Sequence, residues 1–359
     1  MDRRSFIKTL AAGAAATTVL SPLAAAGGIS GMAGTTGSGL GAGRLPRALK
    51  AGDTVRMVAP ASAVEDRHHV LIAKESFEAL GFNVQLGEHV FGRHGYLSGT
   101  DAERAADVNK AFADDSVDAV IAVRGGWGCN RILPLLDYDM IRANNKVLLG
   151  YSDITSLMNA LYVKTGMVSF HGPNGFSYWA DFQAQQFRDV IMDGKSTTMR
   201  NYKEKEETLT MMSNRTTTVN GGKAQGVLVG GNLTVLTSLC GTPYFPDLKG
   251  KILMLEDVGE NIYRIDRFLS QLQLAGHLDG VAGIVFGHCT ECDPGGGFGS
   301  FTLHEVFAHY FEPLGVPTYT GAQFGHIRDN HILPVGHVVE LDADAATLTL
   351  LGSAVQTVS

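Results

Sequence analysis

The chain has 359 residues, of which 45% are hydrophobic and 18% are charged, so it can form about two folded domains with sizeable cores. This composition excludes a disordered, collagen-like or coiled-coil protein. The 29 basic and 36 acidic residues give a formal charge of −7, which is the wrong sign for a protein that binds a phosphate backbone. Nucleic acid is therefore not an expected partner.

The N-terminus has the pattern of an export signal. Arg3 and Arg4 precede an apolar run over residues 9–20, and three alanines follow at 24–26. The run is too short to span a bilayer of about 30 Å. We expect residues 1–26 to be a twin-arginine signal that is removed, leaving a periplasmic protein with no stable membrane anchor. The alternative is a disordered cytoplasmic N-terminus with a chance arginine pair.

From residue 54 onward, short β-rich runs alternate with helical patterns. Strands are expected over residues 55–59, 82–86, 117–124, 146–151 and 168–171, and helices over 64–80, 101–113, 128–136 and 153–165. This alternation predicts βαβ units and a parallel sheet. Residues 119–123 and 147–149 are continuously apolar, which indicates central strands. Thr100 and Glu103 predict a capping box at the start of the second helix.

The polar stretch between residues 194 and 225 predicts a domain boundary. We expect a flexible Gly-rich linker over 27–45, an N-terminal α/β domain over 46–194, an interdomain linker over 195–225 and a C-terminal domain over 226–359. In the C-terminal part, strands are expected over 224–228, 251–255 and 283–286, a helix over 261–275, and a hairpin from 338–341 and 347–351.

Ser152 occupies the turn between a buried strand and a helix. Its hydroxyl is expected at the carboxyl edge of the sheet, where open α/β sheets place their sites. The next main-chain N–H, that of Asp153, belongs to a helix N-terminus and suits an oxyanion. Spacing alone favours the other interpretation, in which Ser152 only caps the helix, because Ile154 stands where the Gly-x-Ser-x-Gly motif has its last glycine.

A glycine-rich turn, RGGWG at 124–128, follows the preceding strand. Glycines in such a turn let the backbone approach a ligand and point N–H groups at an anion, although a tight turn without a ligand fits equally well. A dinucleotide site would require Gly-x-Gly-x-x-Gly and an acidic residue about 20 positions further on. Neither is present in that form, so a nicotinamide cofactor is not expected.

A serine nucleophile needs a base, and His171 and His326 are the candidates. His171 ends the strand after the Ser152 helix, and His326 lies in a polar loop after a strand-like run and before residues 333–336. Their spacing from Ser152 does not show which of the two histidines is the base. Glu256 ends an apolar strand, where its carboxylate could orient a histidine. Alternatively, Glu256 and Asp257 are acidic residues before a helix, where negative charge is favourable.

Two of the four cysteines form a single Cys-x-x-Cys pair, Cys289 and Cys292. This is half of a zinc ribbon, and no second pair exists, so zinc is not expected. In an oxidising compartment a local disulfide is the expected state, with two buried thiols as the alternative.

Several motifs, in order along residues 52–351, resemble the LD-carboxypeptidase family of serine peptidases, the muramoyltetrapeptide carboxypeptidases. This family is related to the microcin C self-immunity hydrolases. The motifs are VAPAS at 58–62, RGGWG at 124–128, GYSDIT at 150–155, HGP at 171–173, GGNL at 230–233, LEDVGE at 255–260 and FGH at 324–326.

The resemblance implies that Ser152 is the nucleophile, Glu256 the carboxylate and His326 the base, which favours His326 over His171. It implies a Rossmann-like N-terminal domain with a parallel sheet, a β-rich C-terminal α/β domain and an active site in the cleft between them. It also implies a homodimer without a metal or other cofactor. Most relatives are regarded as cytoplasmic, and the export signal departs from that pattern.

We therefore expect a serine carboxypeptidase that hydrolyses the amide between an L-centre and a C-terminal D-amino acid, releasing D-Ala from murein tetrapeptide through an acyl-enzyme. Gly126 and Asp153 are expected to form the oxyanion hole, and Arg124, Gly125 and His171 to bind the substrate. One alternative is a hydrolase of peptide-nucleotide or other amide antibiotics. Outside the enzymes, the alternative is an exported solute-binding protein.

Overall fold

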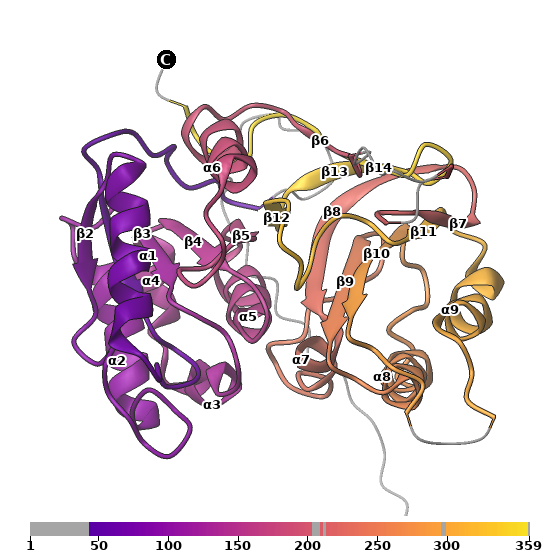
Figure 1. The fold of residues 1–359 in the computed structure, drawn as a ribbon, viewed down its shortest axis with the longest axis horizontal. Coiled ribbons are helices and arrows are strands. Elements are labelled where there is room, and N and C mark those ends of the chain that lie inside the picture. The colour runs from indigo at the N-terminus through magenta and orange to yellow at the C-terminus, as the bar shows by residue number, and fades with distance from the viewer. Residues whose placement is uncertain (1–42, 203–208, 211–212, 296–298, 358–359) are drawn as a thin grey trace, which may run out of the picture. The chain divides into compact units, whose positions relative to one another are not determined.

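Two β-sheets and the helices around them make up the computed structural model (Figure 1). It describes residues 43–202, 209–210, 213–295 and 299–357. The expected export signal over 1–26 and most of the linker over 27–45 therefore lie outside the described residues. No helix in these ranges is both long enough and apolar enough to cross a membrane.

The first sheet has six strands in the order β12-β5-β4-β3-β1-β2. Five of them are parallel: β1 (Thr54–Val58), β2 (Asn83–Leu86), β3 (Ala119–Ala122), β4 (Val147–Gly150) and β5 (Ser169–His171). The short strand β12 (Leu333–Val335) runs antiparallel to β5 at the edge. The predicted parallel sheet is confirmed, and β3 and β4 are fully buried in its interior because helices cover both faces.

Helices connect the strands of this sheet: α1 (Arg67–Ala79), α2 (Asp101–Ala113), α3 (Cys129–Ile132), α4 (Tyr138–Ala143) and α5 (Ile154–Thr165). The capping box of Thr100 and Glu103 starts α2 as predicted. The helix expected over 128–136 was too long, since it divides into α3 and a 3₁₀ turn over Leu133–Leu135. Pro134 has no N–H to continue an α-helix.

The second sheet has eight strands in the order β6-β14-β13-β8-β9-β10-β11-β7. Its parallel centre consists of β8 (Lys223–Asn232), β9 (Ile252–Val258), β10 (Gly283–Thr290) and β11 (Thr318–Thr320). The predicted hairpin is confirmed as β13 (Val338–Asp342) and β14 (Thr347–Leu350). Two edge strands, β6 (Thr198–Met199) and β7 (Thr217–Asn220), come from the stretch that was expected to be a linker.

The helices beside the second sheet are α7 (Leu233–Thr237), α8 (Ile262–Leu274) and α9 (Leu303–Phe311), of which only α8 was predicted. Figure 1 shows them along the lower and outer side of the sheet. A further helix, α6 (Asp181–Phe187), continues into a π-helical turn over Arg188–Met192.

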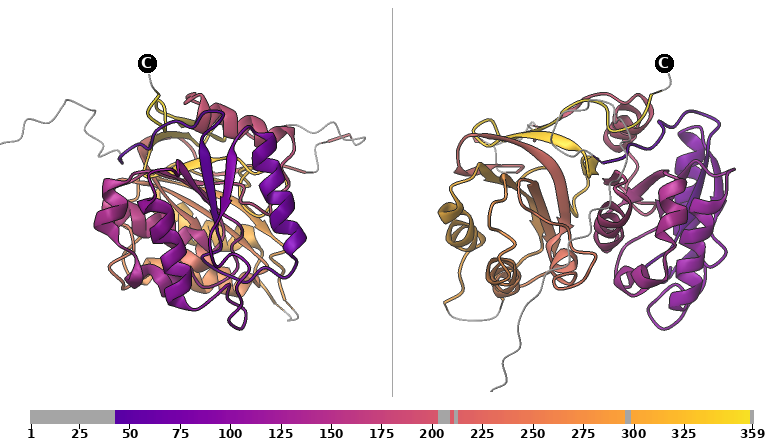
Figure 2. Two further views of the ribbon diagram at one scale, coloured as in Figure 1. Left: turned by 90° about the vertical axis from the view of Figure 1, so that its left-hand side faces the viewer. Right: turned by 180° about the vertical axis from the view of Figure 1, so that it is seen from behind.

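Helix α5 lies between the two sheets, where it contacts β8 and α7 (Figures 1 and 2). Every residue from 154 to 161 is buried, since both sheets cover the helix. Two polar contacts connect α5 to β8: Thr155 Oγ1 accepts the N–H of Asn232 at 2.9 Å, and Asn159 Nδ2 donates to the carbonyl of Gly230 at 2.9 Å. These contacts fix the start of α5, and hence Ser152, against the second sheet.

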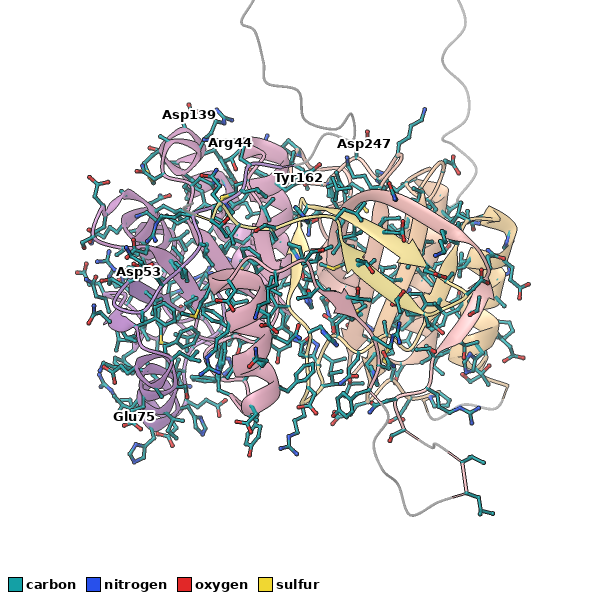
Figure 3. All side chains as sticks on the ribbon, turned by 90° about the horizontal axis from the view of Figure 1, so that it is seen from above. Arg44, Asp53, Glu75, Asp139, Tyr162 and Asp247 are labelled. Carbon is teal, nitrogen blue, oxygen red and sulfur yellow. A yellow bond between two sulfur atoms is a disulfide. The ribbon has the colours of Figure 1, made fainter. Side chains whose placement is uncertain are left out.

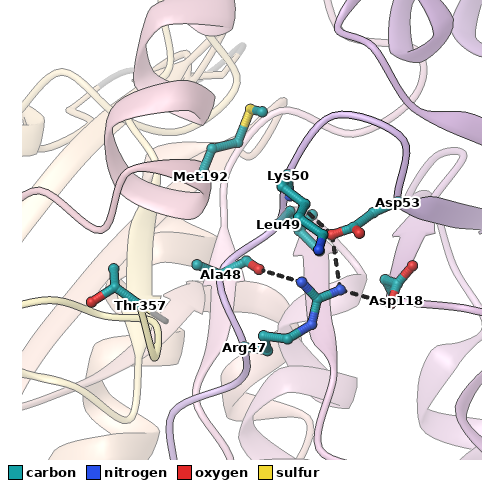
Figure 4. A pocket seen from close by; sticks show the side chains of 8 residues that line it. All are labelled: Arg47, Ala48, Leu49, Lys50, Asp53, Asp118, Met192 and Thr357. Carbon is teal, nitrogen blue, oxygen red and sulfur yellow. Dashed lines mark hydrogen bonds and ion pairs between the residues drawn. The ribbon is translucent and has the colours of Figure 1, made fainter. Parts of the chain in front are cut away.

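Arg47 ties the segment before β1 to the first sheet (Figure 4). Its Nη2 donates to Asp53 Oδ2 at 2.8 Å and to Asp118 Oδ1 at 2.7 Å. These three residues line a pocket of about 620 Å³ that shares no lining residue with the pocket at Ser152. Another pocket, of about 410 Å³, has seven lining residues. Three of them, Arg44, Tyr162 and Asp247, are labelled in Figure 3.

Candidate active site

Ser152 forms the sharp turn between β4 and α5. Its φ of +65° lies in the left-handed region, which non-glycine residues seldom adopt. Such strain is typical of serine nucleophiles on strand-to-helix turns. The alternative role as a helix cap does not hold, because the N-cap of α5 is Asp153 and no side chain caps the helix. The turn is thus formed although Ile154 replaces the motif's last glycine.

The fold brings Ser152, His326 and Glu256 into one hydrogen-bonded chain. His326 Nε2 lies 2.9 Å from Ser152 Oγ, and His326 Nδ1 lies 2.7 Å from Glu256 Oε2. Ser152 follows a strand of the first sheet, Glu256 lies within β9 of the second, and His326 lies on the loop after β11. A hydroxyl, an imidazole and a carboxylate in this order can polarise the hydroxyl for nucleophilic attack.

The charges in this chain are set by burial and by the neighbouring groups. Glu256 is fully buried, which by itself raises its pKa, but the neighbouring imidazoles of His171 and His326 outweigh burial and lower the pKa to about 2. Burial likewise opposes protonation of His326, but the bond to Glu256 and its charge raise the His326 pKa above 6.5. Glu256 is therefore ionised, and it stabilises the protonated form of His326.

Two features hold the His326 loop in place. Gly325 has a φ of +118°, and a Cβ at this position would lie 2.9 Å from Glu256 Oε2, so only glycine fits without displacing the carboxylate. The Tyr151 ring packs against the imidazole of His326 with centroids 4.9 Å apart. Sequence reasoning assigned no role to Tyr151, although it lies inside the GYSDIT motif, directly before the serine.

The glycine turn after β3 touches the nucleophile. A Cβ on Gly125 would lie 3.0 Å from Ser152 Oγ, which shows how close the two turns are. Ser62 Oγ accepts the N–H of Trp127 at 3.1 Å and so positions the turn from its other side. Sequence reasoning gave Ser62 no function, although the residue ends the VAPAS motif.

Asp153 connects the same two turns. Its Oδ2 accepts the N–H of Cys129 at 2.7 Å, and burial raises the pKa of this carboxyl to about 6. Within the described part of the chain, the main-chain N–H groups of Gly126 and Asp153 make no hydrogen bond. Two unpaired N–H groups beside a nucleophile are what an oxyanion hole requires.

The site opens into a pocket of about 530 Å³. The lining residues are Glu65, His69, Arg124, Gly125, Gly126, Tyr151, Ser152, Asn174, Phe176, Val258 and His326. Arg124 donates to the carbonyl of Ala63 at 3.1 Å, and no carboxylate in the described ranges pairs with it. Arg124 and Gly125 thus lie where a substrate would contact them. His171 does not line the pocket, because it is fully buried behind Glu256.

The Cys-x-x-Cys pair, which the sequence analysis considered as half of a zinc site, forms a disulfide. Cys289 and Cys292 are joined, which confirms the expected local bond. Across the described residues, no group of three or more His, Cys, Asp or Glu side chains is arranged to hold a metal ion.

Together, the α/β fold and a hydroxyl–imidazole–carboxylate chain beside a glycine turn define a hydrolase. Residues 55–172 match the LD-carboxypeptidase N-terminal domain, and residues 225–341 match the LD-carboxypeptidase C-terminal domain. The chain belongs to the LD-carboxypeptidase family of peptidases, as the sequence motifs indicated.

Individual relatives agree with this assignment. The chain is 39% identical to the probable murein peptide carboxypeptidase of Bacillus subtilis, over 81% of this chain and 89% of the relative. It is 28% identical to the microcin C7 self-immunity protein MccF of Escherichia coli, over 84% and 94%. The crystal structure of muramoyltetrapeptide carboxypeptidase from Oxalobacter formigenes, 30% identical, superposes with a TM-score of 0.71 over 83% of this chain and 97% of that one.

Proposed function

We propose that the protein is a serine-type LD-carboxypeptidase that releases the terminal D-alanine of murein tetrapeptide. The observation that carries this proposal is the hydrogen-bonded chain from Ser152 Oγ through His326 to Glu256, at the wall of a pocket that also contains Arg124. An imidazole that is bonded to a hydroxyl and oriented by a buried carboxylate is the arrangement that activates serine toward amides.

The proposed reaction passes through an acyl-enzyme. Nε2 of His326 takes the Ser152 proton while Oγ attacks the carbonyl carbon of the amide between the L-centre and the D-residue. The N–H groups of Gly126 and Asp153 stabilise the oxyanion, and donors of this kind contribute roughly 3–4 kcal/mol each in other enzymes. His326 then gives its proton to the leaving amine. In the second step His326 takes a proton from water, the water oxygen attacks the acyl carbon, and the proton returns to Ser152 Oγ as the ester bond breaks.

We assign the terminal carboxylate of the substrate to Arg124. A carboxypeptidase must compensate the negative charge of the substrate's C-terminus, and a guanidinium group can bind a carboxylate with two parallel hydrogen bonds. Support comes from the position of Arg124 in the pocket and from the lack of a carboxylate partner among the described residues. The adjacent backbone of Gly125 adds to this proposed subsite.

The test is incubation with murein tetrapeptide while mass spectrometry follows D-alanine. We expect the folded wild type to release D-alanine and leave the tripeptide, and Ser152→Ala to release none. Absence of release by the folded wild type contradicts the proposal, as does release by Ser152→Ala at the wild-type rate.

A hydrolase of peptidyl nucleotides is the second candidate, which the 28% identity to MccF supports. A panel of peptidyl nucleotides in the same assay separates the two candidates by the ratio of their kcat/KM values. An exported solute-binding protein would instead retain ligand binding in Ser152→Ala and would show no fluorophosphonate labelling of Ser152 in the wild type.

We further propose that the protein is exported to the periplasm by the twin-arginine route and that it forms a homodimer.

A further inference from the structure

The carboxylate of Glu256 faces two imidazoles, and the mechanism above uses only one of them. Its Oε2 is hydrogen-bonded to His326 Nδ1. Its Oε1 is buried and has no hydrogen-bond partner in the described part of the chain, but it lies 3.9 Å from His171 Nε2. Neither ring nitrogen of His171 has another partner there, and both side chains are fully buried.

His171 is held at this position by the fold. It ends β5, where its backbone lies between Gly150 of β4 and Leu333 of β12. The aromatic rings of Tyr151 and Phe324 each have their centroid 6.0 Å from the centroid of the imidazole. The imidazole therefore packs beside two aromatic rings, and the carboxylate oxygen that faces it is Glu256 Oε1.

A buried N–H group and a buried carboxylate oxygen are each costly to leave without a hydrogen-bond partner. When they face each other, the structure is stabilised if the N–H group donates to the oxygen. For His171 this requires the tautomer that carries its proton on Nε2. If the 3.9 Å between His171 Nε2 and Glu256 Oε1 closes to hydrogen-bond distance, the carboxylate is held on both oxygens and cannot rotate, so Oε2 stays aligned with Nδ1 of His326. The fully buried ring cannot reach a substrate in the pocket, which leaves His171 no direct contact with the reaction.

We propose that His171 is a positioning residue whose Nε2–H group holds Oε1 of Glu256 and thereby orients His326 toward Ser152. This inference rests on the proposed function, in which His326 is the base. It differs from a role for His171 as the base or as a substrate ligand.

The test compares His171→Phe, which keeps a ring but removes the donor, with His171→Gln, which keeps an N–H donor. We expect His171→Phe to lower kcat for murein tetrapeptide roughly tenfold or more, with KM within about twofold of the wild type, because the substrate does not touch this residue. His171→Gln should recover most of this loss. The matched control is His337→Phe, since His337 is also buried but has no hydrogen bond or ion pair with Glu256 within the described ranges.

A second readout does not depend on the substrate. The downfield proton resonance of His326 Nδ1, which reports its bond to Glu256, should shift or broaden in His171→Phe and stay as in the wild type in His337→Phe. If the wild type releases no D-alanine, the proposed function fails, but this resonance still tests the positioning role. An unchanged resonance in folded His171→Phe would overturn the inference, as would equal losses of kcat in His171→Phe and His171→Gln.

Discussion

At the scale of single residues, Ser152 carries its hydroxyl on a strained backbone. A left-handed φ, here +65°, costs an L-residue about 1–2 kcal/mol, and glycine avoids this cost. We predict that Ser152→Gly and Ser152→Ala both lose turnover, but that Ser152→Gly is the more stable by about 1 kcal/mol in urea unfolding. Equal stability of the two variants would show that the turn stores no strain.

The second residue-scale prediction concerns pH. His326 can take the Ser152 proton only when it is neutral, and Glu256 raises the His326 pKa above 6.5. The kcat/KM of the wild type should therefore fall as the pH drops through a midpoint above 6.5, while Glu256, with a pKa of about 2, stays ionised throughout that range.

Glu256→Gln is the matched variant for this pH profile. It removes the charge that raises the His326 pKa, so the midpoint should move to lower pH, and kcat should fall on the order of 10⁴-fold because the amide no longer fixes the imidazole tautomer that carries its proton on Nδ1. A wild-type midpoint below 6.5, or one that Glu256→Gln leaves unchanged, would contradict the assigned role of the carboxylate.

At the scale of elements, local signals predicted local structure best. The bounds of α2 agree with the predicted 101–113 because its capping box and apolar spacing lie within the helix itself. The strand β12 was not predicted, because three residues at 333–335 have no strand signal of their own and pair with β5 far away in the sequence. For the same reason the edge strands β6 and β7 were missed in a polar stretch.

The element-scale prediction concerns the segment before β1, which Arg47 fastens to Asp53 and Asp118. Arg47→Met should lower the free energy of unfolding by about 1 kcal/mol, because it leaves a largely buried Asp53 carboxylate without its ion pair, while kcat stays unchanged. Lys74→Met is the control, since Lys74 and Glu78 form an ion pair at i, i+4 on the surface of α1. This variant should lose less than about 0.5 kcal/mol. A larger loss in Lys74→Met than in Arg47→Met would contradict the assigned role of Arg47.

At the scale of the whole molecule, the site combines residues that are distant in the sequence. Ser152 and the glycine turn could be predicted, because strand-to-helix turns of a parallel sheet point to one edge. Spacing alone left His171 and His326 as equal candidates for the base, since His326 lies 174 positions after Ser152 and only the fold joins them. The family motifs chose His326, but nothing in the sequence indicated that His171 faces Glu256.

A whole-molecule prediction concerns the proposed export. Replacing both Arg3 and Arg4 with lysine should leave uncleaved protein in the cytoplasm, because the arginine pair is read by a receptor. Cell fractionation and the mass of the N-terminus measure this. Because lysine keeps the positive charge, an effect of the double variant comes from loss of the arginine pair itself. Normal cleavage of that variant would contradict export by the twin-arginine route.

The central claim is that Ser152, His326 and Glu256 act as one nucleophilic unit. Fluorophosphonate labelling followed by intact-mass and peptide analysis tests it most directly, since the reagent forms a covalent bond with an activated serine. We predict a single adduct on Ser152 in the wild type, far slower labelling in His326→Ala and none in Ser152→Ala. Absence of the adduct on Ser152, or labelling at the wild-type rate in His326→Ala, would contradict the account.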